Sequence, residues 1–235
     1  NARINKEGYE SLDEVMESAL EPLGLPAFKE LIKDDDTIIL DTRNAGVFSE
    51  GFVPGSINIG LDGRFAEWAG SLLPFDKPIV LVTEPGREKE SAIRLARVGF
   101  DKMKGFLNGG FEAWMKAGEY VDLIINVDPE EFSMDLRFDP KMLVVDVRRE
   151  TEYGNGHLAD ARNIPLETLT DPGTMADFND NDNIYLHCAS GYRSIIACSL
   201  CKRQRIFNVR NVAGGFEAIK GLEGMEVVKE NSVLN

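Results

Sequence analysis

Short apolar runs alternate with amphipathic patterns along most of this chain. The apolar runs predict buried strands at residues 37–41, 57–59, 78–83, 142–147, 162–164 and 183–188. Patterns of helical period predict helices at residues 11–20, 26–33, 91–98, 110–116, 194–203 and 215–221. Buried strands that alternate with helices predict an α/β fold, in which helices cover both faces of a parallel sheet. The tail after Gly221 has little periodicity, and we expect a surface strand or a loose end there.

The pattern occurs twice at one constant spacing. Ile-Leu-Asp-Thr-Arg around Asp41 matches Val-Val-Asp-Val-Arg around Asp146, and 146 − 41 = 105 positions. The same offset links Asn58 to Asn163, Gly86 to Gly191, and Gly-Gly-Phe-Glu-Ala at 109–113 to the same run at 214–218. Such anchors predict two tandem copies of one fold of about 100 residues each. We expect an N-terminal helical extension or linker at 1–24, a first domain at 25–120 and a second at 121–235.

Charge and cysteine content restrict the classes of partner and the compartment. The formal net charge of −14 disfavours binding to nucleic acid or to anionic membranes. No apolar run approaches the ~20 residues that a membrane-spanning helix needs. An odd number of cysteines, three, argues against a disulfide framework and favours a reducing compartment, for which we expect the cytoplasm. The first residue is not Met, so upstream sequence is expected.

A cysteine stands at the head of the loop that joins a predicted strand to a predicted helix in the second copy. Backbone N–H groups and the helix dipole favour an anion at such a junction, so Cys188 is predicted to be a thiolate nucleophile. Gly191 lets the loop curl tightly, Ala189 and Ser190 are small enough to leave the sulfur reachable, and Arg193 adds a cation. Such a thiolate accepts a sulfane sulfur as a persulfide, which a thiol or cyanide then removes.

Four separated motifs resemble the rhodanese family. They are Asp146-Val147-Arg148, Gly-His-Leu-Ala-Asp-Ala at 156–161, Cys188-x-x-Gly191-x-Arg193-Ser194, and Gly214-Gly215-Phe216. The resemblance extends over both copies, roughly residues 25–221. It implies a sulfurtransferase of the thiosulfate sulfurtransferase type, with Cys188 and Arg193 as catalytic residues and no cofactor beyond the covalent persulfide. The substrate loop would comprise Ala189, Ser190, Gly191, Tyr192 and Ser194. Its donor would be thiosulfate or a low-molecular-weight persulfide, and its acceptor a thiol or cyanide.

Two other functions remain open. Phosphatases of the same fold resemble Cys-x5-Arg, whereas four residues separate Cys188 from Arg193 here, and this shorter loop disfavours a phosphatase. The other alternative is a sulfur-carrying or partner-binding module. It draws on a weaker resemblance of Asn5-Lys6-Glu7-Gly8-Tyr9, Pro22-Leu23 and Phe28 to the segment that joins a metallo-β-lactamase-type persulfide dioxygenase to rhodanese repeats. That resemblance implies a metal-dependent oxidase domain upstream of this chain.

The first copy departs from the family pattern at the decisive position. Thr83 aligns with Cys188, since 188 − 83 = 105, and a threonine hydroxyl cannot hold a persulfide. Gly86 keeps the turn, but Glu84, Glu88 and Glu90 are expected to place negative charge where an anionic substrate would lie. We therefore expect a degenerate, catalytically inactive site in the first domain.

The remaining candidate residues have structural interpretations. Arg193 either faces the substrate or pairs with Glu150 or Glu152. Asp146 and Arg148 are expected to form a salt bridge. None of the other candidate side chains is expected to bind a metal. We expect core packing for four of them, Cys198, Cys201, Trp68 and Trp114, and we expect His157 to satisfy backbone groups. His187 precedes Cys188 on a predicted strand, so alternation points it away from the sulfur.

Overall fold

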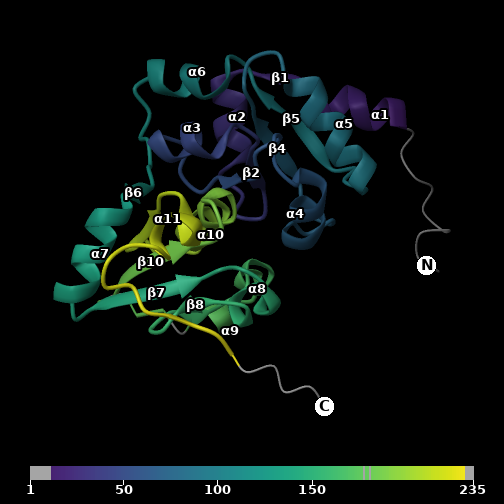
Figure 1. Ribbon diagram of the computed structural model, residues 1–235. Helices are drawn as coiled ribbons and strands as arrows, with labels where there is room; N and C mark the ends of the chain where they lie inside the picture. Colours follow the sequence, from purple (N-terminus) through teal and green to yellow (C-terminus); the bar gives the residue numbers. More distant parts are fainter. Residues whose placement is uncertain (1–11, 177, 180, 231–235) are drawn as a thin grey trace. The chain divides into compact units, whose positions relative to one another are not determined.

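The computed structural model describes residues 12–176, 178–179 and 181–230. The chain divides into two compact units, one formed by Asn1–Asn44 and Phe52–Val121, the other by Ala45–Gly51 and Asp122–Asn235. Each unit contains a five-stranded sheet in which all pairings are parallel, with helices packed around it (Figure 1). The prediction of a tandem α/β fold is confirmed.

The first unit is built around the strand order β1-β5-β4-β2-β3. Its strands are β1 (Pro22–Leu23), β2 (Ile38–Asp41), β3 (Ile57–Asn58), β4 (Ile79–Val82) and β5 (Met103–Leu107). Its helices are α1 (Leu12–Ala19), α2 (Leu25–Leu31), α4 (Phe65–Leu72), α5 (Glu88–Val98) and α6 (Gly110–Lys116). The central strands β2 and β4 are buried along their whole length, which explains their continuous apolar runs. Trp68 and Trp114 are buried, as expected for core residues.

The second unit repeats this sheet in the order β6-β11-β10-β7-β9. Its parallel strands are β6 (Ile125–Val127), β7 (Met142–Asp146), β9 (Arg162–Asn163), β10 (Asn183–His187) and β11 (Val209–Val212). Its helices are α3 (Ala45–Glu50), α7 (Pro129–Phe138), α8 (Glu150–Gly154), the 3-10 helix η1 (Leu166–Thr170), α9 (Pro172–Met175), α10 (Tyr192–Arg203) and α11 (Gly215–Ile219). Between β7 and β10, Asp146 pairs in register with His187, so both strands end side by side. The carboxyl edge of this sheet therefore places the strand before Cys188 beside the Asp146 motif.

The tail of the chain forms a short strand outside the two five-stranded sheets, and part of the N-terminal region lies outside the described residues. In the tail, β12 (Val227–Val228) pairs antiparallel with β8 (His157–Leu158), so a short surface strand forms, as expected. At the other end, Ser11 and the run Asn5–Tyr9 lie outside the described residues, whereas Phe28 is buried in the core of the first unit. Among the described residues, no helix has the length and apolar character needed to cross a membrane.

Candidate active site

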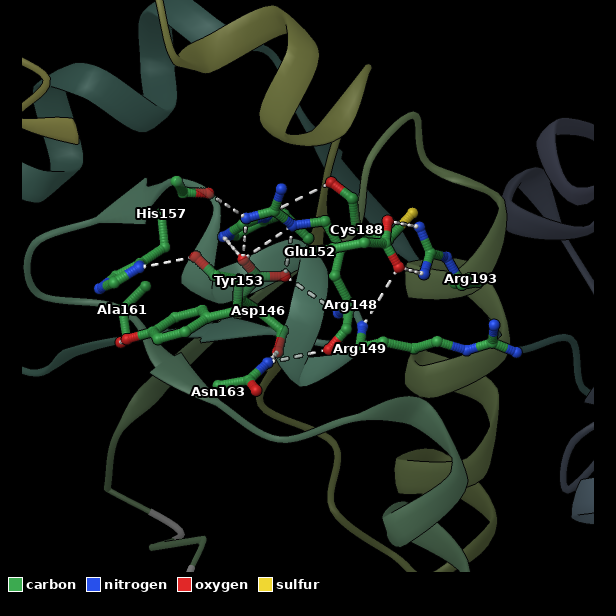
Figure 2. A network of polar contacts seen from close by, with 12 residues as sticks. Asp146, Arg148, Arg149, Glu152, Tyr153, His157, Ala161, Asn163, Cys188 and Arg193 are labelled. Carbon is green, nitrogen blue, oxygen red and sulfur yellow. Dashed lines mark hydrogen bonds and ion pairs between the residues drawn. The ribbon is translucent and has the colours of Figure 1, made fainter. Parts of the chain in front are cut away.

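A buried ion pair supports the carboxyl edge of the second sheet. The Arg148 guanidinium donates through Nε to Asp146 Oδ1 at 3.0 Å and through Nη2 to Oδ2 at 2.6 Å, and both residues are buried. The same guanidinium, labelled Arg148 in Figure 2, donates to the Gly156 carbonyl oxygen at 2.8 Å. It also lies 4.0 Å from the ring centroid of Phe216. The predicted salt bridge between Asp146 and Arg148 is confirmed. Because both charges are paired and hydrogen-bonded, the pair holds a fixed geometry beside the cysteine loop.

The Asn163 side chain completes this support, and its role was not recognised from the sequence. Its Nδ2 donates to the carbonyl oxygens of Asp146 and Arg148, both at 2.9 Å (Figure 2). These bonds satisfy two backbone acceptors at the point where β7 ends. The signal was present in the sequence, because Asn58 and Asn163 share the 105-residue offset, and Asn58 makes the equivalent bonds to Asp41 and Arg43.

Cys188 follows the last residue of β10, and α10 begins four residues later. Gly191 has a φ of 107°, a left-handed conformation that folds the loop back on itself. As a result the Gly191 N–H donates to Cys188 Sγ at 3.1 Å. The Ser194 hydroxyl, in the first turn of α10, lies 3.6 Å from the same sulfur. The loop therefore offers an anionic sulfur one backbone donor and one side-chain donor.

The sulfur is less accessible than the small loop residues suggested. Ser190 is exposed, and Ala189 and Tyr192 are half-buried, but Cys188 itself is only 1% exposed. The prediction of a readily reachable sulfur is therefore wrong for this conformation. The backbone of Cys188 is itself closely approached by α11, where the Phe216 N–H donates to the Cys188 carbonyl oxygen at 2.7 Å. A Cβ on Gly215 would lie 2.4 Å from that oxygen, so only glycine allows the approach.

Arg193 is held by Glu152, which decides between the two carboxylates considered from the sequence. Its Nη1 and Nη2 bond to the two carboxylate oxygens at 2.6 and 2.8 Å (Figure 2). Hydrogen bonding from Arg193 lowers the pKa of Glu152 below its ordinary value. The hydrogen bond to Glu152, and to a smaller extent the negative charge of Cys188, raise the pKa of Arg193. The guanidinium is thus a permanent cation that a carboxylate holds in place.

Neither histidine of the chain bonds to the sulfur. His187 Nδ1 lies 3.3 Å from the Cys188 carbonyl oxygen and its Nε2 lies 3.9 Å from Asp146 Oδ2. Burial lowers the pKa of His187, so the ring stays neutral. His157 stacks on Tyr153 and its Nδ1 lies 2.9 Å from the Tyr153 carbonyl oxygen. His157 therefore interacts with the backbone, as predicted, and His187 does not bond to the sulfur, in keeping with the expected alternation along its strand.

The other two cysteines pack inside the second unit, on α10. Cys198 and Cys201 are fully buried, and the described structure contains no disulfide between them. Burial raises the pKa of Cys198 well above its ordinary value and that of Cys201 to about 12. The prediction that this Cys-x-x-Cys is core packing is confirmed.

The first unit repeats the support but not the sulfur site. Arg43 pairs with Asp41 at 2.6 Å and lies 4.3 Å from the Phe111 ring centroid, at positions offset by 105 from those of Arg148, Asp146 and Phe216. Thr83 occupies the cysteine position and is buried. The Gly86 N–H, which matches the sulfur donor Gly191, instead donates to Glu88 Oε1 at 3.1 Å. The loop donor is therefore already occupied by a carboxylate of the chain.

The charge of that degenerate loop stays negative, as expected. Glu84 and Glu90 pair with Arg87, at 3.5 and 2.9 Å. Arg87 also bonds to Asp62, at 2.9 Å. One guanidinium cannot balance three carboxylates, so the loop disfavours a substrate anion.

The fold and the cysteine loop define an α/β protein with a candidate thiol site in its second unit, and comparisons with known proteins agree. The sequence profile of the rhodanese-like domain matches residues 25–117 and 128–222, so the chain belongs to the rhodanese family, with two copies of the domain. A sulfurtransferase of Allochromatium vinosum is 29% identical over 96 residues, which are 41% of this chain and 88% of that protein. The thiosulfate sulfurtransferase GlpE of Actinobacillus succinogenes is 28% identical over 101 residues, 43% of this chain and 88% of that protein.

Two solved structures are also similar to parts of this chain. A rhodanese-like domain protein of Staphylococcus aureus is 30% identical and covers 44% of this chain and 97% of its own, with a TM-score of 0.39. A thiosulfate sulfurtransferase of Pseudomonas aeruginosa is 17% identical and aligns with 90% of this chain, with a TM-score of 0.40. This chain spans 44% of that structure.

Proposed function

We propose that the second unit is a sulfurtransferase that carries sulfane sulfur on Cys188. The observation that carries the proposal is the Gly191 N–H donating to Cys188 Sγ at 3.1 Å within a strand–loop–helix junction. The Ser194 hydroxyl and the half-buried Arg193 lie on the same loop and favour negative charge at this sulfur. Family membership and the sulfurtransferases among the relatives support the same chemistry.

The proposed reaction has two steps and balances without a cofactor. The Cys188 thiolate attacks the outer sulfur of the donor, the donor's S–S bond breaks, and its remaining part leaves with the electron pair. With thiosulfate the leaving group is sulfite, and with a low-molecular-weight persulfide it is a thiolate. A thiol or cyanide then attacks the outer sulfur of the Cys188 persulfide, and the Cys188 thiolate leaves. The loop donors stabilise the thiolate and the persulfide alike, since both are anions.

The first unit is proposed to be catalytically inactive. Thr83 cannot form a persulfide, the Gly86 donor bonds to Glu88, and Arg87 is paired with three carboxylates.

We propose that the protein is located in the cytoplasm. The three cysteines are free thiols in the described structure, which fits a reducing compartment.

Thiocyanate formation from thiosulfate and cyanide tests the proposal. We expect turnover by the wild-type chain and a loss of at least about a hundredfold in Cys188→Ser, because a serine hydroxyl forms no persulfide. Cys198→Ser, on the helix α10 that follows the cysteine loop, is the matched control and should retain turnover. A phosphoester assay under the same conditions tests the alternative. Turnover of the phosphoester together with none of thiosulfate would replace this proposal by a phosphatase.

A further inference from the structure

A cavity of about 460 Å³ lies in the first unit, away from the cysteine loop in sequence. It is lined by Gly63, Arg64, Phe65, Ala66, Glu67, Arg94 and Arg97. The residues come from the start of α4 and from the outer face of α5, two helices that pack against each other. This volume is within the range of ligand sites, and it far exceeds the space of a single oxyanion, since one water takes up about 30 Å³.

The lining of this cavity carries mainly basic side chains, although the chain as a whole is acidic. Three of its side chains are guanidinium groups, although the chain as a whole carries 40 acidic and 26 basic residues. Glu67 is the one acidic residue in the lining, and it pairs with Arg64 Nε at 2.6 Å. The remaining charge of the lining is therefore positive, and it favours an anion at this place.

Several donors of these arginines are left for a ligand. Arg97 is exposed and has no ion-pair or hydrogen-bond partner among the described residues. Arg94 is held in place, because its Nη1 donates to the Leu61 carbonyl oxygen at 2.7 Å and its Nη2 pairs with Glu90 at 2.5 Å. Arg97 offers its guanidinium to a carboxylate or phosphate in a two-pronged geometry, whereas both terminal nitrogens of Arg94, one helical turn away, are already bonded.

The uncharged part of the lining indicates an organic body. Phe65 is almost fully buried and faces the cavity together with Ala66 and Gly63. Sites for small molecules combine such apolar walls with a few polar groups that fix orientation. We propose that this pocket binds a small organic anion that carries a carboxylate or phosphate group. This inference does not rest on sulfur transfer at Cys188, which belongs to the other unit.

Calorimetric titration of the full chain tests the proposal with three probes: citrate for carboxylates, AMP for an organic phosphate, and inorganic phosphate for the bare oxyanion. We expect saturable binding of citrate or AMP with a Kd of about 1 mM or tighter, and inorganic phosphate to bind about tenfold more weakly. Binding should weaken with added salt. The organic probe that binds more tightly shows whether the site prefers a carboxylate or a phosphate group. Binding of neither, or inorganic phosphate binding as tightly, would overturn the proposal.

Variants of the chain then test whether the organic anion binds in this pocket. The double variant Arg64→Gln, Arg97→Gln removes two exposed charges and should weaken binding about tenfold or more, since each charged hydrogen bond contributes substantially. Lys104→Gln removes an exposed charge elsewhere in the same unit and should leave the Kd unchanged. Cys188→Ser should also leave it unchanged, so that failure of the sulfur chemistry and failure of this site are separable. An unaltered Kd in the double variant would exclude this pocket.

Discussion

Arg193 and Glu152 form a two-pronged ion pair, with both terminal nitrogens of the guanidinium bonded to the two carboxylate oxygens at 2.6 and 2.8 Å. The negative charge of Cys188 acts on the same guanidinium. Glu152 and an anionic sulfur therefore compete for one cation. Because the pair lowers the pKa of Glu152, its contribution to stability is present above the ordinary value of 4.5 and is lost as the pH falls through the lowered pKa. At neutral pH the pair is intact.

Glu152→Gln is expected to increase the reactivity of Cys188. The substitution keeps the shape of the side chain but removes the competing negative charge, so Arg193 stabilises the thiolate more effectively. We expect the alkylation rate of Cys188 by iodoacetamide at pH 7 to rise about threefold, and Arg193→Gln to lower it by a similar factor. Glu150→Gln is the matched control, because Glu150 is an exposed carboxylate on the same helix. A slower reaction in Glu152→Gln would show that the pair serves only to orient the loop.

Cys188 is expected to be the reactive thiol of the native chain. Burial raises the pKa values of Cys198 and Cys201, whereas Cys188 bonds to a loop N–H that favours the thiolate. Partial alkylation at pH 7 followed by peptide mass analysis should find at least about tenfold more label on Cys188. Alkylation after denaturation, where all three thiols are accessible, is the control for peptide recovery. Preferential labelling of Cys198 or Cys201 in the native chain would contradict the assignment.

Restoring a cysteine to the first unit is not expected to restore a site. In the double variant Thr83→Cys, Cys188→Ser, the new thiol lacks a free loop donor, because the Gly86 N–H bonds to Glu88. We expect thiocyanate formation below about a hundredth of the wild-type rate. Adding Glu88→Ala releases that N–H and should raise the rate measurably. A rate near wild type in the double variant would mean that the loop was competent and only the nucleophile was missing.

Gly215→Ala is expected to disturb both stability and the cysteine loop. Its φ of +58° is unfavourable for alanine by about 1–2 kcal/mol, and the new Cβ would lie 2.4 Å from the Cys188 carbonyl oxygen. We expect the Tm to fall by about 5 °C or more and the alkylation rate of Cys188 to change. Gly110→Ala is the matched variant in the first unit, where the Cβ would lie 3.0 Å from the Thr83 carbonyl oxygen. It should lower stability without altering Cys188, and equal effects of both variants on Cys188 would contradict this account.

The repeat made much of this structure predictable. Two pairs of anchors at the 105-residue offset make matched contacts: Asp41 and Asp146 bind their arginines, and Asn58 and Asn163 bind equivalent backbone oxygens. The strands were recognisable because buried parallel strands are continuously apolar. Helix α7 was not, because Phe132 is its only buried residue and its apolar pattern is correspondingly weak.

The details of the site depended on packing between distant segments. Two carboxylates, Glu150 and Glu152, were equally plausible partners of Arg193, and only the position of α8 selects Glu152. Gly215 and Phe216, which follow Cys188 by more than 25 positions, approach its backbone through α11. No pattern within the loop itself contains that information. The upstream metallo-β-lactamase-type domain and the donor and acceptor of the sulfur stay predictions.

The intact mass of the chain after incubation with a sulfur donor tests the central claim most directly. With thiosulfate or glutathione persulfide, followed by removal of excess donor, the account predicts a gain of one sulfur atom, located by peptide analysis on Cys188. Cys188→Ser should gain none, and cyanide should return the wild-type mass to its original value with release of thiocyanate. Loading that cyanide and thiols cannot reverse would indicate a sulfur carrier that needs a protein partner. No adduct on Cys188 with either donor, or an adduct that persists in Cys188→Ser, would contradict the account.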